Sequence, residues 1–156
     1  MVYIEFAKDN SGQRPVLNEL ERLRKQAAAN NPEAIWLLQR ITRALQFAQR
    51  YGIPEALIHN LISEDDVGIP FTLVQPVKAL KSHQPLYELR VNQKNRKGAF
   101  RAIFFTHIFE GNQILVFTYS VMKMKTSSPE FDRAVEFTER MIPDFLKDPS
   151  KYINGG

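Results

Sequence analysis

Basic side chains are concentrated in one stretch of the chain, residues 78–125. This stretch holds nine of the 21 Lys and Arg residues but only two acidic residues, Glu88 and Glu110. Its formal charge is therefore +7, whereas the remaining residues sum to −3. Clustered Lys and Arg side chains attract phosphate groups, which supply most of the affinity of proteins for nucleic acids. The charge distribution predicts a polyanionic partner.

Three β-type runs must position these basic residues. In the first run, residues 87–91, apolar and polar side chains alternate, so that Glu88 and Arg90 share the polar face. The second run, residues 100–109, is largely apolar on both faces, which is typical of a central strand. A glycine turn joins it to the third run, residues 114–123, and predicts an antiparallel hairpin.

Helical periodicity precedes and follows these strands. A short alternating strand at residues 2–6 comes first, and helices then begin at Pro15 and at Asn31-Pro32, the second of which runs to Gly52. A last helix, with an apolar stripe at helical spacing, begins at Pro129. The pattern predicts one α+β domain over residues 1–156, with an N-terminal helical hairpin and a C-terminal helix packed on a twisted, mainly antiparallel sheet.

Residues 53–76 carry a weaker pattern. Residues 54–62 predict a short third helix, and residues 63–66 predict an acidic, solvated loop.

The helix that begins at Asn31-Pro32 carries three arginines. We interpret them as a solvated face, with nucleic-acid contact as the alternative: Arg40, Arg43 and Arg50.

Composition excludes several classes of chemistry. The chain has no cysteine, so disulfides, thiolate nucleophiles and cysteine zinc sites are absent, and its three histidines are too scattered to suggest a metal site. Hydrophobic residues at 44% and charged residues at 24% are ordinary for a globular protein. The N-terminal residues lack the plan of a signal peptide, and no window resembles a membrane span. We expect a cytoplasmic protein without a membrane partner.

The order of specific residues carries more information than periodicity. It runs Val77-Lys78-Ala79-Leu80, then Leu86-Tyr87-Glu88-Leu89-Arg90, then Phe100-Arg101, then the hairpin, and then Lys123 with Pro129 and Ala134 downstream. This order resembles the RelE/HigB family of bacterial and phage toxins. The resemblance covers residues 77–137, and the N-terminal helices agree with the family in type and order only.

The resemblance implies a fold and a function. It implies a RelE-like fold and the toxin of a type II toxin-antitoxin system, a hydrolase that cuts mRNA on the ribosome and is neutralised by a small antitoxin protein. Cleavage by 2′-hydroxyl attack builds negative charge at phosphorus, which fixed Lys and Arg groups can stabilise without a metal ion. The resemblance therefore implies an endoribonuclease that needs no metal and no cofactor.

The resemblance also assigns roles to individual residues. Arg101 and Lys123 match the family's arginine and first lysine, which act in catalysis. Glu88 is the candidate general base, with His107 as an alternative that a packed core position explains better. The remaining candidates would bind the RNA backbone: Lys78, Arg90, Lys94, Arg96, Lys97 and Lys125. Basic loop residues can also be solvated strand edges that discourage pairing.

Two residues depart from the family pattern. Met124 stands where a second basic residue commonly follows the lysine, and Phe131 stands where some members have a tyrosine. Either the activity is weakened or Lys125 substitutes. Three hypotheses follow: an active mRNA endonuclease, a catalytically impaired relative that binds RNA or the ribosome, and a protein-binding module with a basic face.

The register of the hairpin decides whether Arg101 and Lys123 can share one phosphate. A loop of only Gly111 and Asn112 would place the two side chains on opposite faces of the sheet. A three-residue loop, or a bulge of one residue, would bring Arg101 opposite Val121, on the same face as Lys123. We therefore predict an odd-length loop or a bulge.

Overall fold

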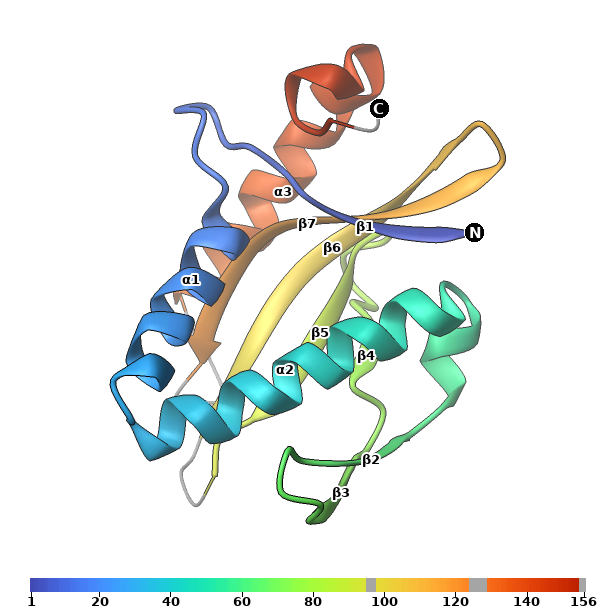
Figure 1. Ribbon diagram of the computed structural model, residues 1–156. Helices are drawn as coiled ribbons and strands as arrows, with labels where there is room; N and C mark the ends of the chain where they lie inside the picture. The colour runs from blue at the N-terminus through green and yellow to red at the C-terminus, as the bar shows by residue number, and fades with distance from the viewer. Residues whose placement is uncertain (95–97, 124–128, 155–156) are drawn as a thin grey trace.

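A computed structural model describes residues 1–94, 98–123 and 129–154, apart from the side chain of Lys123. The protein is an α+β fold in which helices cover both faces of a mixed sheet (Figure 1). Its elements, in chain order, are β1 (Val2–Phe6), α1 (Pro15–Ala28), α2 (Pro32–Tyr51), η1 (Glu55–Ile58), β2 (Leu61–Glu64), β3 (Pro70–Leu73), β4 (Val77–Ala79), β5 (Tyr87–Asn92), β6 (Ala99–Phe109), β7 (Asn112–Lys123), α3 (Pro129–Lys147) and η2 (Pro149–Lys151).

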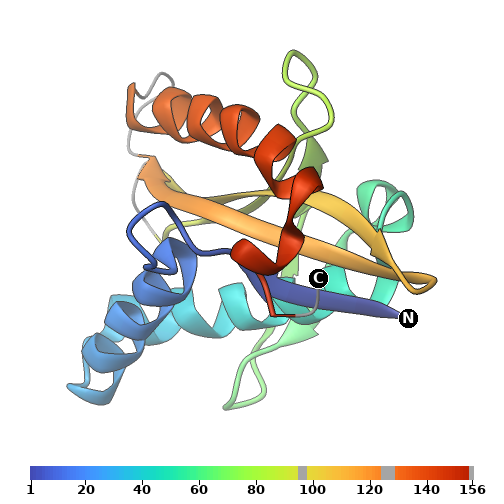
Figure 2. The same ribbon diagram turned by 90° about the horizontal axis from the view of Figure 1, so that it is seen from above.

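The main sheet has five strands in the order β1-β7-β6-β5-β4. The edge strand β1 runs parallel to β7, and all other neighbours are antiparallel. Figure 2 shows α3 on one side of the sheet and the α1–α2 pair on the other. Each side has its own apolar core, because residues such as Phe100 and Phe104 face α1 and α2, while Ile103 and Phe105 face α3. The predicted α+β class, N-terminal helix pair and C-terminal helix are confirmed.

Helix α2 begins and ends as its sequence predicts. The Asn31 side chain accepts hydrogen bonds from the backbone N–H groups of Glu33 and Ala34, which caps the helix. At its other end Gly52 has a positive φ of 67°, and an added Cβ there would lie 2.7 Å from the side-chain oxygen of Gln113. The Gln113 amide bonds both backbone groups of Ile53, at 2.8 and 2.9 Å, so this end of α2 is fixed to β7.

The segment between α2 and the main sheet differs from the prediction. In place of a longer helix and an acidic loop, a single 3-10 turn leads into the antiparallel hairpin β2–β3, which forms a separate two-stranded sheet. The turn is stabilised by Asp65, whose carboxylate accepts hydrogen bonds from the N–H groups of Val67 and Ile69. Two of the predicted loop acids therefore lie at the turn of a hairpin. Within the described ranges, no helix has the length and apolar character needed to cross a membrane.

Candidate functional site

The β6–β7 hairpin contains the predicted bulge. Its loop is the two-residue turn Glu110-Gly111, with φ values of 51° and 77°. The ladder then shifts between Ile103 and Phe104, so that Thr118 is an extra residue on β7. The prediction of an odd-length loop or a bulge is confirmed through the bulge, and the loop itself has two residues.

The bulge sets the register that the candidate site requires. Arg101 lies opposite Val121, as predicted, and Ala99 lies opposite Lys123. Thr118 is buried, and its hydroxyl lies 2.6 Å from that of Thr138 on α3, which is also buried. The extra residue therefore has a buried hydrogen-bond partner on the helix that covers this face of the sheet.

Arg101 and Glu88 form a buried ion pair between β6 and β5. The Nε of Arg101 donates to the Glu88 carboxylate, and the two side chains are only 9% and 6% exposed. On the other side, the guanidinium carbon of Arg101 lies 3.7 Å from the ring centroid of Phe131 in the first turn of α3. The positive charge of Arg101 is thus neutralised by one neighbour and covered by another.

Four of the predicted site residues share the sheet face that α3 covers. In the strand ladder Arg90 pairs with Arg101, and Lys78 pairs with Glu88, so these side chains occupy two adjacent rungs across β4, β5 and β6. Lys78 and Arg90 are exposed, and the Nε of Arg90 donates to the side chain of Asn92 at 3.3 Å. Arg101 itself is buried, so among the described residues its side chain is not part of an exposed surface.

Lys94, the one further RNA-binding candidate among the described residues, does not lie on this face. Lys94 is exposed and lines a pocket of about 180 Å³ with residues of α1 and α2, on the face of the sheet opposite α3. Arg96, Lys97 and Lys125 lie outside the described residues, as does the side chain of Lys123.

His107 is a packed residue, as the sequence analysis favours. Its ring meets Phe145 edge-on, with 5.0 Å between ring centroids, and its buried Nε2 has no hydrogen-bond partner within the described part of the chain. Burial lowers the pKa of His107. It also lies six residues along β6 from Arg101, roughly 20 Å away at the usual rise per strand residue. The His107 ring is therefore too far from Arg101 to act as general base for an RNA 2′-hydroxyl whose phosphate is bound there.

Two residues have roles that sequence analysis missed. Phe131 covers Arg101, although its sequence position indicates only a departure from a family pattern. Arg40 is 6% exposed, so its interpretation as part of a solvated face is wrong. Its guanidinium lies 3.8 Å from the ring of Trp36 and 4.4 Å from that of Phe71, and burial lowers its pKa. A tryptophan one turn before an arginine is the local signal that could have indicated this stacking.

Residues 1–94, 98–123 and 129–154 contain no group of three or more His, Asp or Glu side chains that could hold a metal ion. Comparison with family models, with curated proteins and with solved structures found no match to this chain.

Proposed function

We propose that this protein is a RelE/HigB-like toxin of a type II toxin-antitoxin pair, which cuts mRNA on the ribosome without a metal ion. The observation that carries the proposal is the pair of adjacent rungs formed by Lys78 with Glu88 and Arg90 with Arg101. Three cationic side chains and one carboxylate thus lie together on one face of the sheet. The helix pair, mixed sheet and C-terminal helix also agree with what the sequence resemblance implies.

The buried ion pair suggests how the two groups would act. A phosphate that replaces Glu88 beside the Arg101 guanidinium would be stabilised there as negative charge develops on it. The released Glu88 carboxylate can then take the proton of the RNA 2′-hydroxyl, whose oxygen attacks the phosphorus. The bond to the 5′-oxygen breaks, that oxygen takes a proton from water, and a 2′,3′-cyclic phosphate remains. The resemblance gives Lys123, whose backbone lies opposite Ala99, the role of a further cation.

Induced expression in bacteria tests this proposal. The wild-type chain should arrest growth and produce cuts in a reporter mRNA that primer extension detects. Arg101→Ala should abolish both, whereas Arg133→Ala, which removes an exposed arginine of α3, should leave both unchanged. Co-expression of a small acidic protein encoded beside this one should relieve the arrest. Equal cutting by the wild type and Arg101→Ala would reject the role of Arg101.

A second candidate function is an impaired relative that binds RNA or the ribosome without cutting. The observation that favours it is the state of Arg101, which is buried, paired with Glu88 and stacked on Phe131. This candidate predicts no cuts and no arrest, but sedimentation of the protein with ribosomes. That sedimentation should weaken in Lys78→Ala and Arg90→Ala.

A further inference from the structure

The edge strand β1 directs half of its backbone polar groups away from the sheet. The backbone N–H of Gln113 donates to the Met1 carbonyl at 3.0 Å, and that of Ala7 donates to the Phe117 carbonyl at 2.9 Å. Alternate residues of a parallel strand bond the same neighbour, so the odd-numbered residues of β1 bond β7. The even-numbered residues therefore direct their N–H and C=O groups to the outer edge, which lies along the border of the sheet (Figure 2): Val2, Ile4 and Phe6.

Side chains close one end of this outer edge and leave the rest of it open. Arg14 donates to the Phe6 carbonyl. Gln49 of α2 approaches the Val2 carbonyl at 3.3 Å, which is longer than the usual hydrogen bond. Among the described residues, neither the Val2 N–H nor the backbone groups of Ile4 have a hydrogen bond outside the β1–β7 ladder. Unpaired backbone groups at a sheet edge are a template for another strand.

Strand β1 also lacks the features that protect exposed sheet edges. Protected edges are commonly short or carry Lys or Pro. The opposite edge of the main sheet, β4, has only three residues, with the exposed Lys78 at its centre. β1 has five residues, without Lys, Arg or Pro, and Glu5 is its one charged residue. Its Tyr3 side chain is 43% exposed and belongs to a residue type that stabilises cross-strand pairs.

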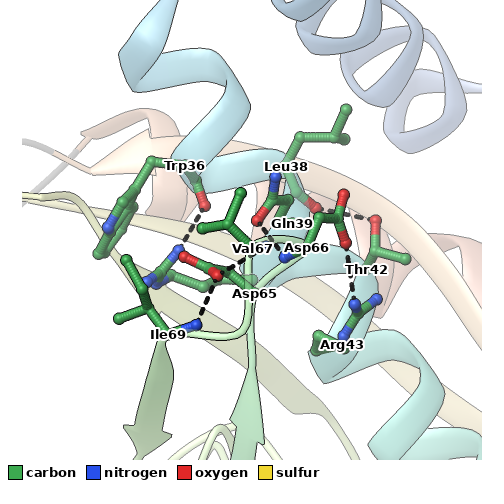
Figure 3. A network of polar contacts seen from close by, with 10 residues as sticks. Trp36, Leu38, Gln39, Thr42, Arg43, Asp65, Asp66, Val67 and Ile69 are labelled. Carbon is green, nitrogen blue, oxygen red and sulfur yellow. Dashed lines mark hydrogen bonds and ion pairs between the residues drawn. The ribbon is translucent and has the colours of Figure 1, made fainter.

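The edges of the β2–β3 hairpin are protected as well. Each of its strands has four residues; β2 ends with Glu64, and β3 begins with Pro70. Its turn is fastened to α2, because Asp66 accepts a hydrogen bond from Arg43 at 3.1 Å and donates its own N–H to the Gln39 side chain at 3.3 Å (Figure 3). Among these described edges, β1 is the longest and the least protected.

We propose that β1 pairs antiparallel with β1 of a second copy of this chain, about a two-fold axis at Tyr3, so that one sheet continues across both copies. Val2 of each copy would exchange N–H···O=C bonds with Ile4 of the other, and the Phe6 carbonyl would keep its bond from Arg14. The Val2 oxygen has a second lone pair for Gln49. The two Tyr3 side chains would lie directly opposite each other as an aromatic pair.

Neighbouring registers fit less well. A two-fold axis at Ile4 needs the Phe6 carbonyl, which Arg14 already occupies. A two-fold axis at Glu5 needs the same carbonyl and also brings two carboxylates directly opposite each other. The axis at Tyr3 needs neither change, so the positions of the free backbone groups select this register.

This interface leaves the proposed RNA site uncovered. Arg101 lies on β6, two strands away from β1 in the sheet order. A groove of about 490 Å³ keeps the side of β1 next to α2 open, and it is lined by Met1, Val2, Tyr3, Gln46, Gln49 and Arg50. The inference therefore goes beyond the proposed function and does not depend on it.

Sedimentation velocity over a range of protein concentrations tests the pairing. The wild type should form a dimer whose fraction rises with concentration. Tyr3→Lys removes the aromatic pair and places two ammonium groups opposite each other, so the dissociation constant of the dimer should rise about tenfold. The matched control Ile62→Lys adds the same charge at an exposed residue of β2 and should leave the constant unchanged. Circular dichroism shows whether both variants are folded.

A disulfide crosslink tests the register, because the chain has no cysteine of its own. The Cα atoms of the two Tyr3 residues would lie about 4.5 Å apart, within the range that a disulfide spans. Tyr3→Cys should therefore give a covalent dimer under mild oxidation. In the control Glu5→Cys, the two Cα atoms would lie at least roughly 13 Å apart, so no covalent dimer should form.

Three results would overturn this inference. One is a wild type that stays monomeric at every concentration, which would leave the edge of β1 to a strand of another protein. Another is loss of the dimer in Ile62→Lys but not in Tyr3→Lys, which would make the hairpin the interface. A third is equal crosslinking of Tyr3→Cys and Glu5→Cys. Growth arrest and mRNA cutting are measured separately, so failure of the dimer is distinguishable from failure of the proposed toxin function.

Discussion

Phe131 covers the guanidinium of Arg101, with 3.7 Å between the guanidinium carbon and the ring centroid. The contact joins the first turn of α3 to the start of β6, and the Glu88 carboxylate completes the enclosure from β5. A charged group in this position is stable only while its counter-charge and its aromatic cover both remain. The same enclosure that stabilises the fold limits access of a phosphate to Arg101.

Loss of the counter-charge should destabilise the protein. In Glu88→Gln the buried guanidinium loses its anionic partner, and we expect the free energy of unfolding to fall by about 3 kcal/mol. Urea unfolding measures this, and Lys78→Gln, an exposed change on the same rung, should stay within about 0.5 kcal/mol of wild type. The double variant Glu88→Leu/Arg101→Met should be more stable than Glu88→Gln, because it leaves no unpaired charge. A Glu88→Gln protein as stable as the wild type would mean that the pair is solvated.

Partial removal of the aromatic cover should raise activity if Arg101 acts on RNA. Phe131→Leu keeps an apolar side chain but removes the cation–π contact, at a cost of about 1 kcal/mol in stability. Primer extension should then show more cutting of the reporter mRNA than with the wild type. Phe137→Leu is the matched control, because Phe137 lies on the same helix but contacts Tyr119 instead. Reduced cutting in Phe131→Leu would indicate that the ring itself contacts the substrate.

The sequence predicts those parts of the fold that depend on local patterns. The caps of α2 follow from Asn31 and Gly52, whose types suit a helix start and a positive φ. The bulge in β7 is not a local pattern: it is predicted because the site that the resemblance implies needs Arg101 opposite Val121, which only an extra residue or an odd loop allows.

The remaining features depend on residues far apart in the chain. Arg40 is buried because the ring of Phe71, 31 residues later in the β2–β3 hairpin, stacks on it. Periodicity in this region is too short to separate a helix from two four-residue strands. Likewise, the position of Arg101 on its strand is predictable, but its burial is set by Phe131 in a different element.

Acidification should destabilise the protein through His107. Burial lowers the pKa of this group below its ordinary value of 6.5 in the folded state. Between the two pKa values the unfolded chain binds more protons than the folded one, so stability falls as the pH drops below about 6.5 and levels off below the folded pKa. Urea unfolding from pH 7.5 to 5 should show a smaller loss of stability in His107→Leu than in the wild type. Equal losses would assign the acid sensitivity to other groups.

The salt dependence of RNA affinity should show which of the two faces of the sheet binds RNA. Lys78 and Arg90 lie beside the Glu88–Arg101 pair on the α3 side, whereas Lys94 lines the pocket next to α1 and α2. If RNA follows the α3 side, Lys78→Ala and Arg90→Ala should each reduce the slope of log K against log salt by roughly one, because one phosphate contact is lost. Lys94→Ala should leave the slope unchanged. Titration of a single-stranded RNA with each variant over a range of salt concentrations measures these slopes. An effect of Lys94→Ala alone would place the RNA against the helix pair and remove Arg101 from its path.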